Sequence, residues 1–334
     1  VARTLTGHKS RRRARASKLA QKGMQMIRSG DLAAGEQALR RSLKISPRHS
    51  QTRAVLAMCL QMRGDSEGAL KEIARSLRTP RPPLRALCIA AQIENATGNA
   101  ETARRLLDQA AARNPDGADS RMLLDAACEL KLDGMVFELT QKALAQSPYD
   151  RVLLHLCAAA TVNTGGPAEH AARCWTRMLR LEPGDEVALY HLAHPDIKPV
   201  GYTCRLPEAE VAARAEALAE AARGGTEGVN DTWTNSGEFR RLVRWAVESG
   251  EGAFMRAGVN LLAAVDAPEA EWLMRQVLVE PAASRQLRHQ ALALLGLRGA
   301  VPPFLVTGED KFSLASAADS GQLPKLPLAY RRVL

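Results

Sequence analysis

Residues 50–83 read SQTRAVLAMCLQMRGDSEGALKEIARSLRTPRPP, which is two short helical patterns separated by Gly64 and closed by prolines. The glycine belongs to a series, because Gly30, Gly64 and Gly98 are spaced by 34 residues. Two prolines, Pro47 and Pro115, lie 68 residues apart, which is two such periods. A fixed period of this length predicts a stack of helical hairpins in which each unit packs only on its neighbours.

The overall composition also favours a helical protein. The chain has 334 residues, of which 46% are apolar and only 4% aromatic. Few aromatic residues and few runs of Val, Ile or Thr argue against a β-sandwich or barrel. No stretch reaches the roughly 18 consecutive apolar residues of a membrane-spanning helix, so we expect no membrane span. The six cysteines contain no Cys-x-x-Cys pair, which indicates buried thiols in a reducing, cytoplasmic location.

The 34-residue unit resembles the tetratricopeptide repeat (TPR) family, whose repeats consist of two antiparallel helices and a turn. The resemblance implies an all-α fold, a right-handed α-solenoid. It covers residues 16–185 as five units, which are 16–49, 50–83, 84–116, 117–151 and 152–185. Small residues recur where TPR helices pack closely, namely Gly23, Ala57, Ala91 and Ala159 in the first helices and Gly35, Ala69, Ala103 and Ala171 in the second helices.

The chain continues beyond the repeats. Residues 184–195 begin like a sixth first helix and stop at Pro195, so the array with its closing helix spans 16–195. Residues 196–235 are expected to form a connector with one helix at 207–223 and a Gly/Thr/Asn-rich loop at 224–235. Amphipathic patterns in 236–300 resemble HEAT-like helical hairpins. Residues 301–334 are expected to form an extended tail with a short hairpin around Gly308.

The excess positive charge is concentrated at the N-terminus. The formal net charge is +10, and residues 1–50 contain 13 Lys and Arg against two acids. We expect residues 1–15 to form a basic arm, so that residues 1–30 could contact a nucleic acid or another acidic partner. A solvated, disordered arm is the alternative interpretation. The residues expected to make these contacts are Arg11, Arg12, Arg13, Arg15 and Lys18.

The sequence contains no motif of a known reaction centre. No glycine-rich stretch is followed by the Lys-Ser/Thr of a phosphate-binding loop, and no Gly-x-Ser-x-Gly elbow is present. The best metal candidate is His191-x-x-His194 with Cys204, to which His170 and Cys174 could add donors. Because a tight cysteine pair and a clear fourth ligand are missing, we predict no metal, no cofactor and no catalytic residues.

The TPR resemblance implies a concave groove lined by the first helix of each repeat, where proteins of the family commonly bind peptides of other proteins. Methionines there would offer an adaptable apolar surface, and Gln and Asn side chains could pair with a peptide backbone. Some of these residues could instead only pack against the next helix. The groove positions carried over onto this chain are Ser17, Met24, Gln51, Met58, Gln61, Arg85, Gln92, Asn95, Arg121 and Asp125.

Three functions are compatible with these features. The first is a noncatalytic scaffold that binds a peptide or a segment of a partner protein in the TPR groove. The second is an RNA- or ribosome-associated protein that uses the basic arm. The third is an enzyme of unknown class, for which no site is visible.

Overall fold

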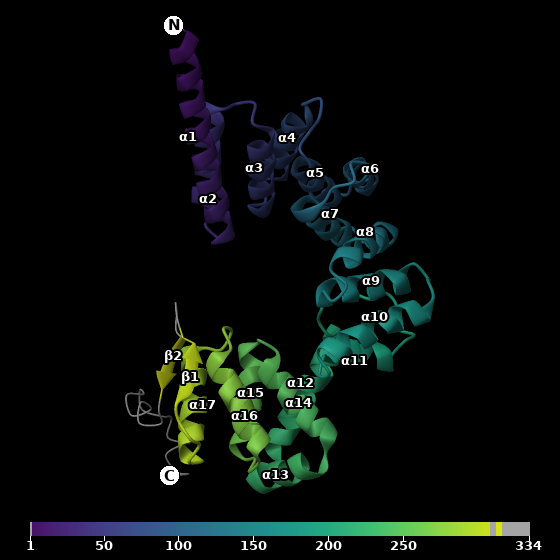
Figure 1. The fold of residues 1–334 in the computed structure, drawn as a ribbon, viewed down its shortest axis with the longest axis vertical. Coiled ribbons are helices and arrows are strands. Elements are labelled where there is room, and N and C mark those ends of the chain that lie inside the picture. The colour runs from purple at the N-terminus through teal and green to yellow at the C-terminus, as the bar shows by residue number, and fades with distance from the viewer. Residues whose placement is uncertain (1, 308–311, 316–334) are drawn as a thin grey trace. The chain divides into compact units, whose positions relative to one another are not determined.

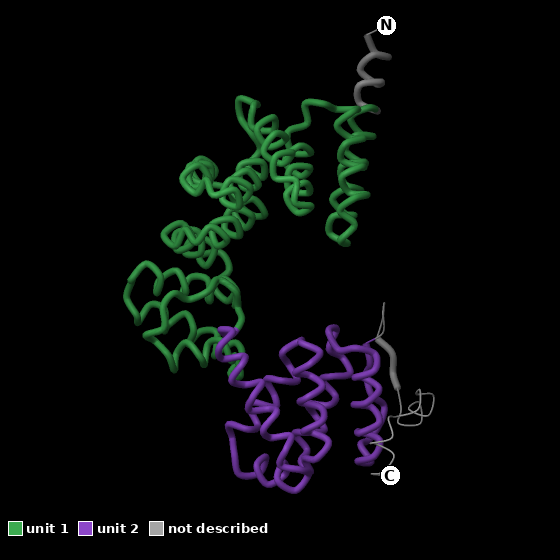
Figure 2. Tube along the Cα trace, turned by 180° about the vertical axis from the view of Figure 1, so that it is seen from behind, with its two compact units in different colours: residues 1–205 green, residues 206–334 purple. Residues whose placement is uncertain are grey.

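The structure is a computed structural model that describes residues 2–307 and 312–315. The chain divides into two compact units, residues 1–205 and residues 206–334, and each is described by itself (Figure 2). In the described residues, the regular structure is α-helical except for one two-stranded hairpin (Figure 1). The fold class is therefore all-α, as the sequence predicts. None of the described helices is both long enough and apolar enough to cross a membrane.

The first unit is a stack of five helical hairpins followed by a single helix, α11 (Glu186–Ala193). Each hairpin pairs an odd-numbered helix with the next even-numbered one. These helices fall where the 34-residue period predicts them. The pairs are α1 (Ala2–Arg28) with α2 (Leu32–Ile45), α3 (Ser50–Met62) with α4 (Ser66–Leu77), α5 (Leu84–Ala96) with α6 (Ala100–Ala111), α7 (Gly117–Glu129) with α8 (Asp133–Gln146), and α9 (Arg151–Asn163) with α10 (Ala168–Leu181).

The turn inside the first three hairpins depends on glycine. Gly30, Gly64 and Gly98 adopt φ angles of +86°, +84° and +88°, in the left-handed region that glycine enters without a steric penalty. The next residue can then cap the second helix, as Asp31 does by accepting a hydrogen bond from the backbone N–H of Ala34. The glycine spacing is therefore a direct record of the turn geometry.

The fourth hairpin makes the same turn without glycine. Lys131 lies between α7 and α8 and adopts a φ of +52°. A side chain in this backbone region costs about 1 kcal/mol relative to glycine. Val136 and Leu139 of α8 are nevertheless buried against the neighbouring repeats. Packing therefore holds the hairpin where the local signal is lost.

The small residues of the first hairpin lie where α1 and α2 are closest. A Cβ atom added to Gly35 would stand 2.7 Å from Cγ1 of Ile27, and one added to Gly23 would stand 2.9 Å from Cγ of Leu39. Both distances are shorter than carbon–carbon contact, so a larger residue would push the helices apart. The packing therefore requires the small residues that the repeat pattern indicates.

The N-terminal segment differs from the sequence-based expectation. The basic residues 1–15 do not form a separate disordered arm, because α1 runs without a break from Ala2 to Arg28. No proline interrupts this stretch, so the helix of the first repeat can continue toward the N-terminus. Ser42 Oγ donates a hydrogen bond to the carbonyl of Ala16 at 2.7 Å and ties α2 to the middle of α1. The first repeat thus has a longer first helix than the others.

The second unit is smaller and ends in the hairpin. The strands pair antiparallel with Phe304 opposite Ala315, which matches the hairpin expected around Gly308. The expected tail beyond residue 315 lies outside the described residues. The elements are α12 (Glu208–Arg223), α13 (Gly225–Asn235), α14 (Gly237–Glu248), α15 (Gly252–Ala263), α16 (Pro268–Val279), α17 (Arg285–Leu297), β1 (Phe304–Thr307) and β2 (Phe312–Ala315).

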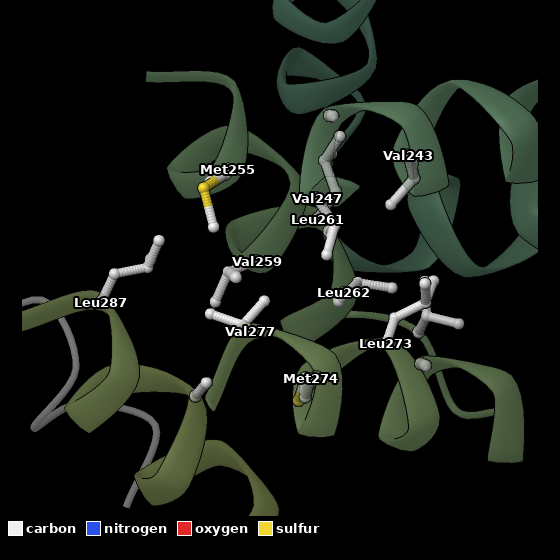
Figure 3. Packing of buried hydrophobic residues seen from close by; sticks show 14 of the residues in the cluster. Val243, Val247, Met255, Val259, Leu261, Leu262, Leu273, Met274, Val277 and Leu287 are labelled. Atoms are coloured by element: carbon white, nitrogen blue, oxygen red, sulfur yellow. The ribbon is translucent and has the colours of Figure 1, made fainter. Parts of the chain in front are cut away.

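One apolar core holds the second unit together. Side chains of α14 to α17 meet around Val259 and Val277 (Figure 3), and the core continues to Phe304 of β1. The expected loop at 224–235 is wrong, because this stretch is helix α13, and the connector contains two helices rather than one. Val229 and Trp233 of α13 are buried in the core, and their burial outweighs the weak helix propensity of Gly, Thr and Asn. The HEAT-like identity of these hairpins stays a prediction.

Candidate peptide-binding groove

The first helices of successive repeats form one surface. α1, α3, α5 and α7 contact each other in this order, whereas α2, α4 and α6 make no comparable contacts among themselves (Figure 1). The guanidinium of Arg85 in the third repeat reaches Sδ of Met24 in the first repeat at 4.0 Å. We call the ten predicted groove residues on these helices the first-helix face.

The residues of the first-helix face are accessible to different degrees. Gln92 Nε2 donates to the Glu129 carboxylate at 2.6 Å, which joins the third repeat to the fourth. Arg121 and Asp125 form an ion pair at 3.4 Å within α7. Ser17, Gln51, Arg121 and Asp125 are exposed, and the half-buried residues are Met24, Met58, Gln61, Arg85, Gln92 and Asn95. The predicted residues thus lie on helices that form a continuous series from repeat one to repeat four.

On the fifth repeat, the first helix is covered by the chain itself. Residues 199–204 form neither helix nor strand and lie along α9. The backbone N–H of Val200 donates to Asn163 Oδ1 at 2.8 Å, and Asn163 Nδ2 donates to the carbonyl of Val200 at 3.0 Å. His155 Nε2 donates to the carbonyl of Gly201 at 3.0 Å. A first helix of this array therefore holds a nonhelical segment by its main chain.

Two side chains of this segment are anchored between repeats. Val200 is buried in the core of the fifth repeat. Tyr202 packs against that core and against the core of repeats three and four, and its hydroxyl donates to the Asp133 carboxylate at 2.5 Å. Burial and this hydrogen bond raise the pKa of Tyr202. The segment thus bridges α8 and α9 and closes this end of the first-helix surface.

Sequence reasoning missed both residues that hold the segment. His155 stands in α9 where Arg121 stands in α7, 34 residues earlier, so the repeat register could have placed it on the same surface. Asn163 has no such counterpart among the predicted residues. No pattern indicates that Val200 returns to α9, because the two partners are 37 residues apart and Val200 lies outside the repeats.

The predicted metal candidate is wrong as a set, because His191, His194 and Cys204 do not form a ligand cluster in the described residues. His191 is buried, and its ring stacks on Trp175 with the centroids 4.8 Å apart. Burial, together with the neighbouring His155, lowers the pKa of His191 to about 4. The two further donors of that candidate, His170 and Cys174, lie close to Cys157 instead.

A separate cleft opens between α6, α7 and α8. Its volume is about 1380 Å³, and Arg121 of the first-helix face borders it. The lining includes Arg104 and Lys142 as well as Asp108 and Glu138. Because charges of both signs are mixed along the lining, the cleft selects no ligand class by charge.

The basic residues of the N-terminal segment lie along α1. Arg12, Arg13, Arg15 and Lys18 are exposed, whereas the side chain of Arg11 lies outside the described residues. A helix that presents several cations could bind an acidic surface. Binding of RNA through these residues stays a prediction.

Comparisons with known proteins reach the fold and stop there. No family model and no curated protein matches the sequence. Among solved structures, PilF of Pseudomonas aeruginosa is 18% identical with a TM-score of 0.43, over 51% of this chain and 77% of PilF. YrrB, described as a TPR protein with an unusual peptide-binding site, is 9% identical with a TM-score of 0.39, over 52% of this chain and 90% of YrrB. The 34-residue period, the paired helices and the left-handed glycines of the chain itself identify residues 16–185 as an array of tetratricopeptide repeats.

Proposed function

We propose that this protein is a noncatalytic scaffold whose first-helix face binds a segment of a partner protein. The observation that carries the proposal is the segment 199–204, which Asn163 and His155 hold on α9 through the backbone of Val200 and Gly201. Recognition of the main chain does not depend on the side chains of the bound segment. A partner segment could therefore be held in the same manner on the repeats that the chain leaves accessible.

The first three repeats carry the side chains that such binding needs. Gln92 and Asn95 are half-buried amides on α5 that can donate to and accept from a peptide backbone. Met24 and Met58 are half-buried and offer a polarizable apolar surface that adapts to different side chains. Arg85 lies beside Met24 and adds a positive charge at this place. The chemistry fits an extended peptide with apolar side chains and a nearby acidic residue.

The experiment selects peptides from a random display library against the full chain and measures their affinity by fluorescence anisotropy. We expect selected peptides to lose binding at least tenfold when Met58, Arg85 and Arg121 are replaced together by alanine. A matched control replaces Gln37, Lys71 and Arg105, which are exposed on second helices, and should retain full affinity. Equal affinity of both triple variants would refute binding on the first-helix face.

A further inference from the structure

Three possible metal ligands meet between α9 and α10. The Sγ atoms of Cys157 and Cys174 and a ring nitrogen of His170 lie within 4.8 Å of one another. His170 and Cys174 are four residues apart on α10 and share one face of that helix, while Cys157 comes from α9. Both cysteines are buried and His170 is half-buried, so the cluster is close to solvent on the imidazole side.

The surrounding hydrogen bonds fix the tautomer of His170. Thr161 Oγ1 donates its single hydrogen to the carbonyl of Cys157 at 2.7 Å. Toward His170 Nδ1, which is 3.1 Å away, the same oxygen can then only accept. Nδ1 therefore carries the ring proton and Nε2 keeps its lone pair. Histidines that bind metals are oriented in this manner, by a hydrogen bond from the ring nitrogen that does not bind the metal.

The environment of Cys157 differs from that of a cysteine that only fills space. Hydrogen bonds from Cys174 and then from polar side chains of α8 and α9 lower the pKa of Cys157 to about 7, although burial opposes this. Cys88, which is buried in α5, shows the contrast, because burial raises its pKa to about 12. The Gln141 amide completes the group, at 3.6 Å from Cys157 Sγ and 3.2 Å from His170 Nε2.

We propose that Cys157, His170 and Cys174 bind one zinc ion. Two thiolates balance the charge of Zn²⁺ and the imidazole is neutral, so the bound site is uncharged and suits a buried position. Binding releases the two thiol protons to solvent. Bonds of about 2.3 Å to sulfur and about 2.1 Å to nitrogen place tetrahedral donor atoms roughly 3.5–3.8 Å apart, so the cluster needs to contract by only about 1 Å.

The fourth position of the zinc falls to water or to Gln141 Oε1, which a half-turn of the amide brings to the place now taken by Nε2. The ion would cross-link α9 to α10. It would thereby fix the repeat that holds the segment 199–204.

The test uses the reduced full-length chain and Co²⁺ as a spectroscopic probe for the zinc site. We expect one equivalent of Co²⁺ to produce a thiolate-to-cobalt charge-transfer band and the visible bands of a tetrahedral site, and Zn²⁺ to displace it. Cys157→Ala and Cys174→Ala should abolish the charge-transfer band. His170→Ala should weaken binding at least tenfold, and Thr161→Val about tenfold, because Thr161 orients the ring.

Matched controls are Cys88→Ala and His289→Ala, which remove a buried cysteine and a histidine from other helices and should leave Co²⁺ binding unchanged. The proposal is overturned if the wild-type chain gives no charge-transfer band or if the Cys157→Ala and Cys174→Ala variants keep it. A chain isolated with a disulfide between these cysteines that takes up no metal after reduction would overturn it as well.

A second readout avoids core variants, which can unfold. Zn²⁺ should slow alkylation of Cys157 and Cys174 in the wild-type chain, as measured by mass spectrometry of the labelled peptides. Cys128, which is partly exposed, should be labelled at the same rate with and without zinc. Equal labelling rates of Cys157 and Cys174 in both conditions would contradict a zinc site.

Discussion

Replacing Asn163 with alanine should loosen the segment 199–204 on α9. The amide makes both hydrogen bonds to the backbone of Val200, one as an acceptor at 2.8 Å and one as a donor at 3.0 Å. Alanine has the highest helix propensity, so the variant keeps the end of α9. The change therefore removes two hydrogen bonds and leaves the apolar contacts of Val200 in place.

The structure sets the size of this effect. Each hydrogen bond contributes about 0.5–1.5 kcal/mol net, so losing both lowers the free energy of local opening by about 2 kcal/mol. Since about 1.4 kcal/mol corresponds to a factor of ten, the amide hydrogen of Val200 should exchange with solvent roughly 30-fold faster. Burial of the Val200 side chain, worth roughly 1.5 kcal/mol, still holds the segment near α9.

Hydrogen exchange followed by NMR or mass spectrometry measures this prediction at Val200. Asn235→Ala is a matched control, because this amide lies in α13 and bonds to Asp231 within the same helix. It should leave the exchange at Val200 unchanged. An unchanged rate in the Asn163→Ala variant would refute the reasoning. An equally large increase throughout α9 would also refute it, because the hairpin itself would then be opening.

Three further changes test other parts of the first unit. Lys131→Gly should raise the free energy of unfolding in urea by about 1 kcal/mol, because φ at this position is +52°; a lower value would contradict the strain assigned to the turn. Gly35→Val should lower the melting temperature by the equivalent of about 1–3 kcal/mol, since a Cβ there meets Ile27 at 2.7 Å, and an unchanged circular dichroism melt would exclude close packing. Lowering the pH from about 7 to about 4 should destabilise the fold through His191. Its pKa is 6.5 when unperturbed and about 4 in the fold, so the unfolded chain binds more protons in this window and stability falls with pH. The melting temperature of His191→Phe should depend less on pH, and equal slopes would assign the effect elsewhere. For the exposed cations of α1, filter binding should show RNA affinity that falls with salt, and no binding at low salt would exclude the RNA-binding alternative.

The repeats could be predicted because their signals are local. Gly64 marks a turn whose φ of +84° suits glycine, and Gly35 marks a close helix contact. Lys131 shows that a repeat can lose such a signal and keep its fold, because packing of the neighbouring helices compensates. Helix α13 shows the opposite limit, since its Gly, Thr and Asn content indicates a loop while burial of Trp233 in the core stabilises a helix.

The candidate site divides in the same manner. The register of the repeats places Met24 and Arg85 on corresponding helices, and Arg85 does reach Met24 in the structure. That register cannot tell which repeats stay accessible. The segment that covers the fifth repeat lies outside the periodic part of the chain.

The sequence by itself determined the repeat period, the places of the turns and the helices that line a common surface, because each depends on residues a few positions apart. Only the tertiary structure decided that Val200 lies on Asn163 and that Cys157, rather than His191, joins His170 and Cys174. Both are contacts between separate elements, and the packing of α9 against its neighbours fixes them. Contacts of this kind are single events in the chain, so they leave no period or motif in the sequence.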